Sequence, residues 1–218
     1  MSTTREAILH KIRAALADVP QDETAVEVAV DRSYLTSDPE PEHRVDRFIE
    51  RVSEYRAKVH RVTADTLAET IARLCASRGI RKLVLPPDIP ASWIPDGLTP
   101  MVDHGLTDDQ LNESDGVLTG CALGIAQTGT IILDRGEHQG RRALTLLPDY
   151  HLCVIREDQI VGIVPEAVRA LQESAGRSDR PMTWISGPSA TSDIELNRVE
   201  GVHGPRTLEV LVVMKQGG

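Results

Sequence analysis

Aromatic residues are scarce in this chain of 218 residues, which contains one Phe, two Trp and three Tyr. Proteins that hold single-stranded nucleic acid stack its bases on aromatic side chains, and a large platform of that kind is not expected here. The formal net charge of −9 also argues against nucleic acid or an anionic membrane as the main partner, because both attract basic surfaces. Because aromatic side chains are so few, the core must be built from Val, Ile, Leu and Ala.

Cysteine is scarce as well, with only Cys75, Cys121 and Cys153, far apart and without a CxxC pair. The chain therefore offers no cysteine framework for an iron–sulfur cluster or a structural zinc, and no HxH or HExxH spacing suggests another metal site. We expect no cofactor and no metal in this chain. No run approaches the roughly 18 apolar residues of a membrane span, and no apolar leader is present, so we expect a cytoplasmic protein without a membrane span.

The first part of the sequence predicts two helices joined by an acidic stretch. Apolar residues at helical spacing predict a helix over residues 3–17, and Phe48 and Val52 lie on the apolar stripe of a second. Between them, residues 18–46 carry nine acidic residues and two arginines, a composition typical of a linker or a wrapping arm. We therefore expect an N-terminal helical extension with an acidic linker over residues 1–57.

From residue 58 onward, strand-like and helix-like segments alternate, which predicts an α/β domain over residues 58–218 with a mainly parallel sheet. Apolar runs such as 211–214 lack alternation, as expected for strands buried on both faces. The predicted strands are 58–62, 83–86, 100–102, 116–119, 129–133, 143–147, 152–156 and 160–164, followed by two closing strands that contain Trp184 and Val210.

Local signals add detail to this domain. A tight turn at 157–159 predicts that the strands on either side of it form a hairpin. A helix is predicted from a Thr63 cap to Ser77, and Thr107 begins another helix with a capping box. A further helix begins at Pro165, with Val168 and Leu171 facing inward.

Two polar loops follow predicted strands near the middle of the domain. The first offers hydroxyl and amide groups beside a glycine, although a plain turn explains it equally; its residues are Gln127, Thr128, Gly129 and Thr130. The second, residues 134–142, is the most basic short stretch of an acidic chain. Its Arg141 and Arg142 have the fork geometry that suits a carboxylate or phosphate, but a solvated charged face is the alternative.

Two more polar loops lie between the last apolar runs. In the segment GPSATSDIE, Gly187 and Ser189 form a turn that could present N–H groups to an anion or simply cap a helix. Asp193 and Glu195 would share one face of an extended segment, where they could act in catalysis or form an exposed acidic edge. In GVHGP, His203 is a candidate acid–base group or a structural histidine.

These loops carry a resemblance to a known family. The segments AQTGTIIL, GRRALTLLPDYHLCVIREDQIV, PEAV, ISGPSATSDIE and GVHGPRTLEV are similar, in order and spacing, to the LUD-domain family and its lactate utilisation protein C group (LutC/YkgG). The resemblance covers about residues 115–213. It implies a fold like that of the NagB/RpiA/CoA-transferase group, a three-layer α/β domain.

The resemblance also implies a role in a three-component system that oxidises L-lactate to pyruvate, in which the iron–sulfur clusters belong to partner subunits. The chain would then bind a small carboxylate or organise the complex without being catalytic alone, and self-association stays open. Arg141, Arg142 and the Gly187–Ser189 amides would hold the carboxylate, and Glu195, His203 and Asp193 would supply the catalytic groups.

One residue departs from the family pattern. Relatives commonly have Glu where this chain has Gln127, and an amide can bind through hydrogen bonds but cannot act as a nucleophile or base. An alternative function is a stand-alone transferase or ligase that acts on a phosphorylated, folate-like or CoA-like ligand.

Overall fold

The computed structural model describes residues 4–17, 33–175, 181–191, 199–200 and 204–215. The chain divides into two compact units, Met1–Tyr34 and Leu35–Gly218. In the first unit, helix α1 (Thr4–Ala15) confirms the predicted helix, and none of its residues is buried. The second unit begins at Leu35, whereas the sequence placed the start of the α/β domain at residue 58.

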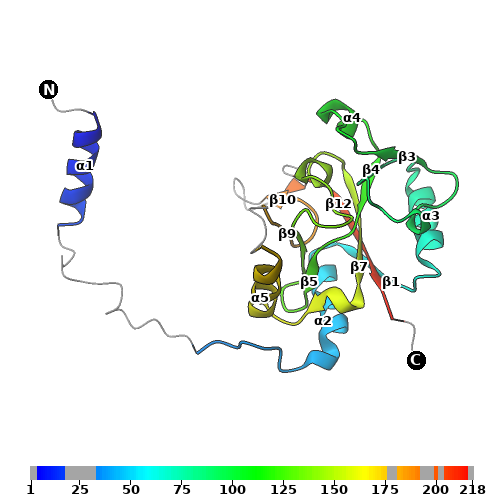
Figure 1. Cartoon of the computed structure of the whole chain (residues 1–218), viewed down its shortest axis with the longest axis horizontal. Coiled ribbons are helices and arrows are strands. Elements are labelled where there is room, and N and C mark those ends of the chain that lie inside the picture. Colours follow the sequence, from blue (N-terminus) through cyan, green and yellow to red (C-terminus); the bar gives the residue numbers. More distant parts are fainter. Residues whose placement is uncertain (1–3, 18–32, 176–180, 192–198, 201–203, 216–218) are drawn as a thin grey trace. The chain divides into compact units, whose positions relative to one another are not determined.

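A six-stranded, all-parallel sheet forms the centre of the second unit (Figure 1). Its two longest strands, β7 and β12, are seven residues each, are almost wholly buried and lie side by side within the sheet. This arrangement confirms the predicted α/β domain with a parallel sheet. In spatial order the strands are β1 (Lys58–Val62), β12 (Thr207–Val213), β7 (Tyr150–Arg156), β4 (Gly116–Thr119), β2 (Lys82–Leu85) and β3 (Thr99–Val102).

Helices cover both faces of this sheet, α3 (Leu67–Arg78) on one side and α2 (Arg44–Glu54) on the other (Figure 1). Helix α2 inserts Phe48 and Val52, both fully buried, into the core cluster formed with β7 and β12. The apolar stripe predicted for the second helix thus faces the core. Because its side chains complete that core, α2 belongs structurally to the α/β unit.

A smaller, mixed four-stranded sheet lies on the α2 side, and the sequence did not predict it. Its strand order is β8 (Ile160–Val161), β5 (Leu123–Ile125), β6 (Thr130–Leu133) and β9 (Thr183–Ile185). Helix α5 (Val164–Ala175) packs on it through Ala167 and Leu171. The prediction that Val168 faces inward is wrong, since that residue is 41% exposed.

The predicted hairpin around residues 157–159 is also wrong. This segment forms a 3-10 helix, η4 (Glu157–Gln159), after which the chain leaves the large sheet and enters the small one. The Gln159 amide Nε2 donates to the carbonyl oxygens of Cys121 (2.7 Å) and Ala122 (3.1 Å). These bonds fasten the turn beside β5, so β8 pairs with β5 instead of folding back on β7.

The segment 143–147 is not a strand either, because it forms the 3-10 helix η3 (Arg142–Thr145). Leu144 is fully buried there, which explains the strand-like apolar pattern of its sequence. Its amide bonds locally to the carbonyl of Arg141 (3.1 Å) and not to a neighbouring strand. A short buried apolar run is thus compatible with either a β-strand or a short helix.

The predicted helix ends agree with the structure, except that the start of α3 is shifted by three residues. Helix α3 begins after Thr66 and not after Thr63, and Gly79 ends it with a φ of +69°, which glycine adopts without strain. The capping box of Thr107 and Gln110 at the start of α4 is confirmed. The remaining elements are α4 (Asp108–Asn112), η1 (Pro41–His43), η2 (Ala91–Trp93), β10 (Ala190–Thr191) and β11 (Val199–Glu200).

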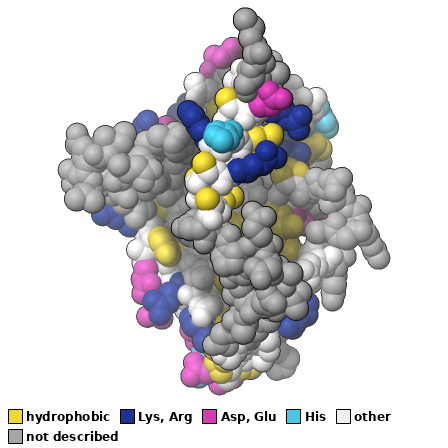
Figure 2. Space-filling model, turned by 90° about the vertical axis from the view of Figure 1, so that its left-hand side faces the viewer, with side chains coloured by type: hydrophobic (Ala, Val, Ile, Leu, Met, Phe, Trp, Pro, Cys, Tyr) yellow, Lys and Arg dark blue, Asp and Glu magenta, His cyan; other side chains and the backbone are white. Residues whose placement is uncertain are grey.

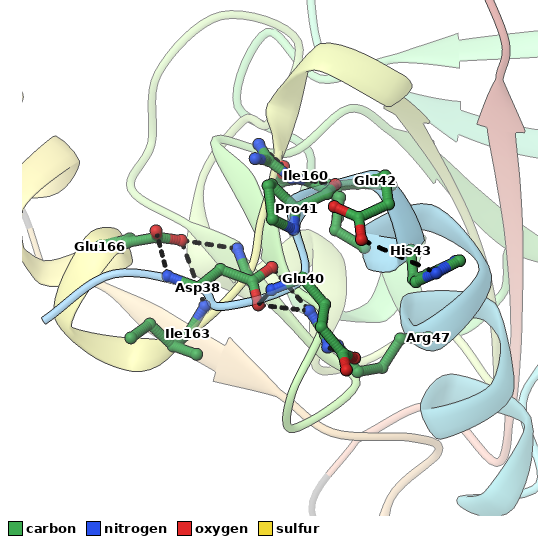
Figure 3. A network of polar contacts seen from close by, with 11 residues as sticks. Asp38, Glu40, Pro41, Glu42, His43, Arg47, Ile160, Ile163 and Glu166 are labelled. Atoms are coloured by element: carbon green, nitrogen blue, oxygen red, sulfur yellow. Dashed lines mark hydrogen bonds and ion pairs between the residues drawn. The ribbon is translucent and has the colours of Figure 1, made fainter. Parts of the chain in front are cut away.

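A polar network fastens the segment before α2 to the start of α5 (Figure 3). The side chain of Asp38 is 1% exposed and accepts two hydrogen bonds from Nη2 of Arg47, at 2.7 and 2.6 Å. Glu166 accepts from the amides of Asp38 and Gly162, each at 2.8 Å. The α/β unit is therefore tied together from residue 38 onward.

A second buried polar centre surrounds Glu209 of β12, whose side chain is 2% exposed. Its Oε1 accepts from Nε of Arg78 (2.7 Å) and also from Nη2, and its Oε2 lies 2.8 Å from Nε2 of His60. The Arg78 guanidinium also lies over the ring of Tyr150, 5.0 Å from its centroid. Both oxygens of this buried carboxylate are therefore bound by basic side chains.

Charges of both signs mix at the surface. On the face drawn in Figure 2, described acidic side chains lie beside basic ones. Among the described residues, no helix is long and apolar enough to cross a lipid bilayer.

Candidate functional site

A cavity of about 280 Å³ opens at the amino ends of β7 and β12, beside β9 and η3. The large sheet contributes His151 and Leu208 to its wall, and η3 contributes Arg142 and Thr145. The complete lining is Arg142, Thr145, Leu146, His151, Thr183, Trp184, Ile185, Ser186, Gly187, Pro188, Ser189, Pro205 and Leu208. Arg142 and the pair Gly187 and Ser189, predicted from two separate loops, therefore meet in this cavity.

The end of α2 explains the glycines of two predicted motifs. A Cβ added at Gly129 would lie 2.6 Å from the carbonyl carbon of Arg51, and one at Gly187 would lie 2.5 Å from Cβ of Tyr55. Both glycines also have positive φ, +59° and +82°, which other residues rarely adopt. Gly129 and Gly187 thus permit close packing against the last turn of one helix.

A chain of hydroxyl groups joins the loop before β6 to the cavity wall. The Oγ1 atoms of Thr128 and Thr130 are 2.7 Å apart, and Thr130 Oγ1 lies 2.8 Å from Oγ of Ser186. Thr130 is buried, while Ser186 lines the cavity. Thr128 and Thr130 therefore support the cavity wall through Ser186 without lining the cavity themselves.

The two adjacent arginines have different environments. Arg141 donates to Asp103 through Nε (2.8 Å) and Nη2 (3.2 Å), and to the carbonyl of Leu106. Burial acts to raise the pKa of Asp103, but these bonds from Arg141 and the backbone amides outweigh it and bring that pKa below its usual value. Arg141 therefore holds the loop that follows β3 and does not line the cavity.

Arg142 is exposed and lines the cavity. Its Nη1 donates to Oγ1 of Thr183 at 3.2 Å, the one side-chain bond of this guanidinium within the described segments. A guanidinium has five N–H donors in a fork that matches a carboxylate. Arg142 is thus the cationic group of the cavity that can bind an anion.

His151 was not a candidate from the sequence, where it is a single polar residue beside an apolar run. It lies on β7, is 0% exposed and lines the cavity. Its Nε2 lies 2.8 Å from Oγ1 of Thr119, and its Nδ1 has no hydrogen-bond partner among the described residues. Burial lowers the pKa of His151 to about 4, so the imidazole is neutral at neutral pH. A buried, titratable residue on a strand is the signal that could have identified it.

Of the remaining candidates, some lie in the described part of the chain, and the others lie outside it. Gln127 is exposed, with its backbone amide bonded to the carbonyl of Gly162 (2.9 Å), and it does not line the cavity. The amide of Ser189 donates to the carbonyl of Pro205 (2.9 Å) and is not directed to a ligand. The proposed catalytic residues Asp193, Glu195 and His203 lie outside the described residues.

A larger cavity, of about 420 Å³, lies at the carboxyl ends of β4 and β7, where α/β proteins often bind ligands. Its charged lining is mainly acidic, Asp134, Glu137 and Asp158 against Arg156, and Arg156 bonds Asp158 at 3.0 Å. Asp134 accepts from the Gly136 amide and the Gln139 side chain, 2.9 Å each. An acidic wall with such internal bonds suits a carboxylate poorly, so the smaller cavity is the better candidate.

The cysteines and the possible metal ligands give no sign of metal chemistry in the described part of the chain. No group of three or more His, Cys, Asp or Glu side chains there is placed to hold a metal ion. All three cysteines are free and buried. Burial raises the pKa of Cys75 to about 11, and a contact with Cys153 together with burial raises that of Cys121, so both thiols are protonated at neutral pH.

The fold and cavity define a class: a parallel α/β domain with a small polar cavity at the amino ends of its inner strands. The chain belongs to the LUD-domain family, whose model matches residues 45–213. It is 51% identical over 168 residues to lactate utilization protein C of Deinococcus radiodurans, which covers 77% of this chain and 78% of that protein. It is also 28% identical to uncharacterized protein YkgG of Escherichia coli K12, with 79% and 80% covered.

A solved structure supports the same relationship. The crystal structure of a DUF162 family protein from Deinococcus radiodurans matches with a TM-score of 0.69 and 43% identity, covering 79% of this chain and 97% of that one. The family match begins at residue 45, within α2, which agrees with the place of that helix in the core.

Proposed function

We propose that this chain is the small-carboxylate-binding subunit of a system that oxidises L-lactate to pyruvate, in which partner subunits carry the iron–sulfur clusters. The family and the name of its relative from Deinococcus radiodurans, lactate utilization protein C, supply the context. The NagB/RpiA/CoA-transferase-like classification of the fold is part of the same proposal, as is a cytoplasmic location.

The observation that carries the proposal is the cavity in which Arg142 meets the segment 183–189. Its volume of about 280 Å³ lies just below the roughly 300–1,000 Å³ of pockets for drug-sized ligands. That size fits a three-carbon acid better than a folate or an acyl-CoA. Arg142 supplies the charge complementary to the carboxylate, while Thr183 and Ser186 add hydroxyl groups nearby.

Calorimetric titration of the full chain with L-lactate and pyruvate tests this proposal. Arg142→Gln should weaken binding of both acids at least tenfold, because it removes the cation but keeps a polar side chain of moderate length. Arg156→Gln is the matched control, since Arg156 lines the larger cavity, and it should leave the affinity unchanged. Equal loss in the two variants, or loss in Arg156→Gln alone, would contradict the assignment of the site.

A ligand screen and a reconstitution test the wider role. Ligands that bind the native state raise its melting temperature, so a shift with nucleotides, folates or acyl-CoAs and none with either small acid would favour a transferase or ligase. The purified chain should show little lactate oxidation alone and gain it with iron–sulfur partners. Full lactate oxidation by this polypeptide alone would end the proposed division of labour.

A further inference from the structure

His151 is a fully buried histidine in the wall of the small cavity, and one of its two ring nitrogens lacks a partner within the described segments. Buried polar atoms in proteins are almost always hydrogen-bonded, and an exception calls for an explanation. Two other buried nitrogens in the described residues, Nε of Arg47 and Nδ1 of His138, are also unpaired, but each belongs to a side chain with an acidic neighbour. Among the described residues, no charged side chain bonds His151, and His151 lines the small cavity.

We propose that Nδ1 of His151 recognises the oxygen on the second carbon of a small 2-hydroxy or 2-oxo acid whose carboxylate is held by Arg142. This inference rests on the proposed function, because it assumes that the small cavity binds the carboxylate. It assigns His151 as the residue that distinguishes such acids from plain carboxylic acids of the same length.

The hydrogen bond to Thr119 explains how one imidazole can serve both kinds of acid. When Nε2–H donates to the Thr119 hydroxyl, Nδ1 is an acceptor, and it can take the hydrogen bond of a 2-hydroxyl group. When the Thr119 hydroxyl donates to Nε2, Nδ1 carries the hydrogen and can donate to a 2-oxo group. Rotation of one hydroxyl and a change of tautomer therefore convert the site from acceptor to donor.

Burial makes this exchange available at neutral pH. A protonated imidazole has two donors and no acceptor, so it could not accept from a hydroxyl group. The pKa of about 4 keeps the ring of His151 neutral, and Thr119, which is also 0% exposed, keeps water from competing for Nε2. The pair Thr119–His151 therefore matches both ends of a 2-hydroxy to 2-oxo conversion without a change in charge.

The test compares L-lactate, pyruvate and propionate as ligands of the full chain by calorimetry. Propionate has the same carboxylate and chain length but no oxygen on the second carbon. The wild-type chain should bind lactate and pyruvate at least tenfold more tightly than propionate. His151→Gln, which keeps an amide in reach of Thr119 but has no counterpart of Nδ1, should bind all three at the propionate level.

Two further variants separate recognition from folding. His151→Asn places an amide near the position of Nδ1 and should recover part of the discrimination. His138→Phe changes a histidine of the larger cavity and should leave the discrimination intact. Nitrogen-15 NMR of the His151 ring supplies an independent readout, because a 2-oxo group only accepts, so saturation with pyruvate should leave hydrogen on Nδ1.

The outcomes distinguish the two proposals. Equal wild-type affinity for lactate and propionate, or undiminished discrimination in His151→Gln, overturns the role of His151 and leaves the carboxylate site standing. A ring nitrogen Nδ1 without hydrogen in the pyruvate complex also overturns it. Absence of binding for all three acids overturns the proposed function together with this inference.

Discussion

Two polar side chains lie buried on the central strands β12 and β7, one on each face of the large sheet. Glu209 is on the face covered by α3, where Arg78 and His60 bind both of its oxygens. His151 pairs in register with Leu208, the residue before Glu209, and lies on the opposite face with one bond to Thr119. The two residues are equally buried, but only the carboxylate has a complete set of partners among the described residues.

The difference separates a structural polar centre from a candidate binding group. A buried carboxylate whose two oxygens are both bonded needs no ligand to satisfy it, and removing one of its partners is costly. A buried nitrogen without a partner, beside a cavity, is a place where a ligand can supply the missing bond. Burial alone does not mark a functional residue, and the count of partners is the more useful measure.

The largest effect should come from Glu209→Leu, because it leaves two basic side chains partly buried without their carboxylate. We expect the free energy of unfolding to fall by about 3–5 kcal/mol, measured by urea denaturation. The double variant Glu209→Leu with Arg78→Met should recover part of this loss, since it removes one of the stranded charges. A loss below about 1 kcal/mol in the single variant would show that the centre is not structural.

The second effect concerns pH and His151. The pKa of His151 is about 4 in the folded chain and about 6.5 for a histidine in an unfolded one, so the unfolded state binds more protons between these values. The stability gained from a neutral His151 is thus complete above about pH 6.5 and lost as the pH falls to about 4. The loss amounts to roughly 3 kcal/mol.

His151→Phe should lack this part of the pH dependence. The difference in unfolding free energy between wild type and variant, followed from pH 7.5 to pH 4, isolates the contribution, because carboxylates titrate alike in both. Arg142, which lines the same cavity, stays charged throughout this range. Parallel curves for the two proteins would mean that His151 is not held neutral by burial.

A smaller effect is expected from Thr119→Val, which keeps the shape of the side chain but leaves Nε2 of His151 without its hydroxyl. We expect a loss of about 1–2 kcal/mol in unfolding free energy. In the double variant with His151→Phe both polar partners are gone, so the combined cost should be less than the sum of the single costs. Simple additivity would show that the two side chains do not interact.

The smallest effect should come from Asp46→Asn, which breaks the ion pair of Asp46 with Arg61. Both side chains are more than half exposed, 66% and 52%. Exposed pairs contribute little, so we expect a change within about 0.5 kcal/mol in unfolding free energy. A loss close to that of Glu209→Leu would contradict the view that burial decides the strength of these contacts.

Much of the fold could be predicted from the sequence because its signals are local. The apolar stripe of α2, the buried strands and the capping box at Thr107 each depend on neighbouring residues. The small sheet was missed because its strands are only two to four residues long and because, apart from β5 and β6, its paired strands lie far apart in the chain. The segment 143–147 shows the same limit of prediction, since an apolar run alone does not reveal whether the segment pairs with a strand or forms a 3-10 helix.

The site was predicted in part for a similar reason. Polar residues in glycine-containing loops stand out, and Arg142, Gly187 and Ser189 do line one cavity. Arg141 has the same chemistry as Arg142, but its bond to Asp103 depends on a residue 38 positions away. His151 could not be distinguished from a core residue until the face of β7 and the partners of its ring nitrogens were known.

The place of β12 in the sheet has a consequence for biosynthesis. This strand follows all the other described strands in the chain, yet it lies between β1 and β7, which are made much earlier. Until β12 emerges from the ribosome, β1 has no neighbour and one edge of β7 stays open, and open edges invite pairing with other chains. The large sheet can therefore close only after all its other described strands have been made, and until then its open edges are exposed to unwanted pairing.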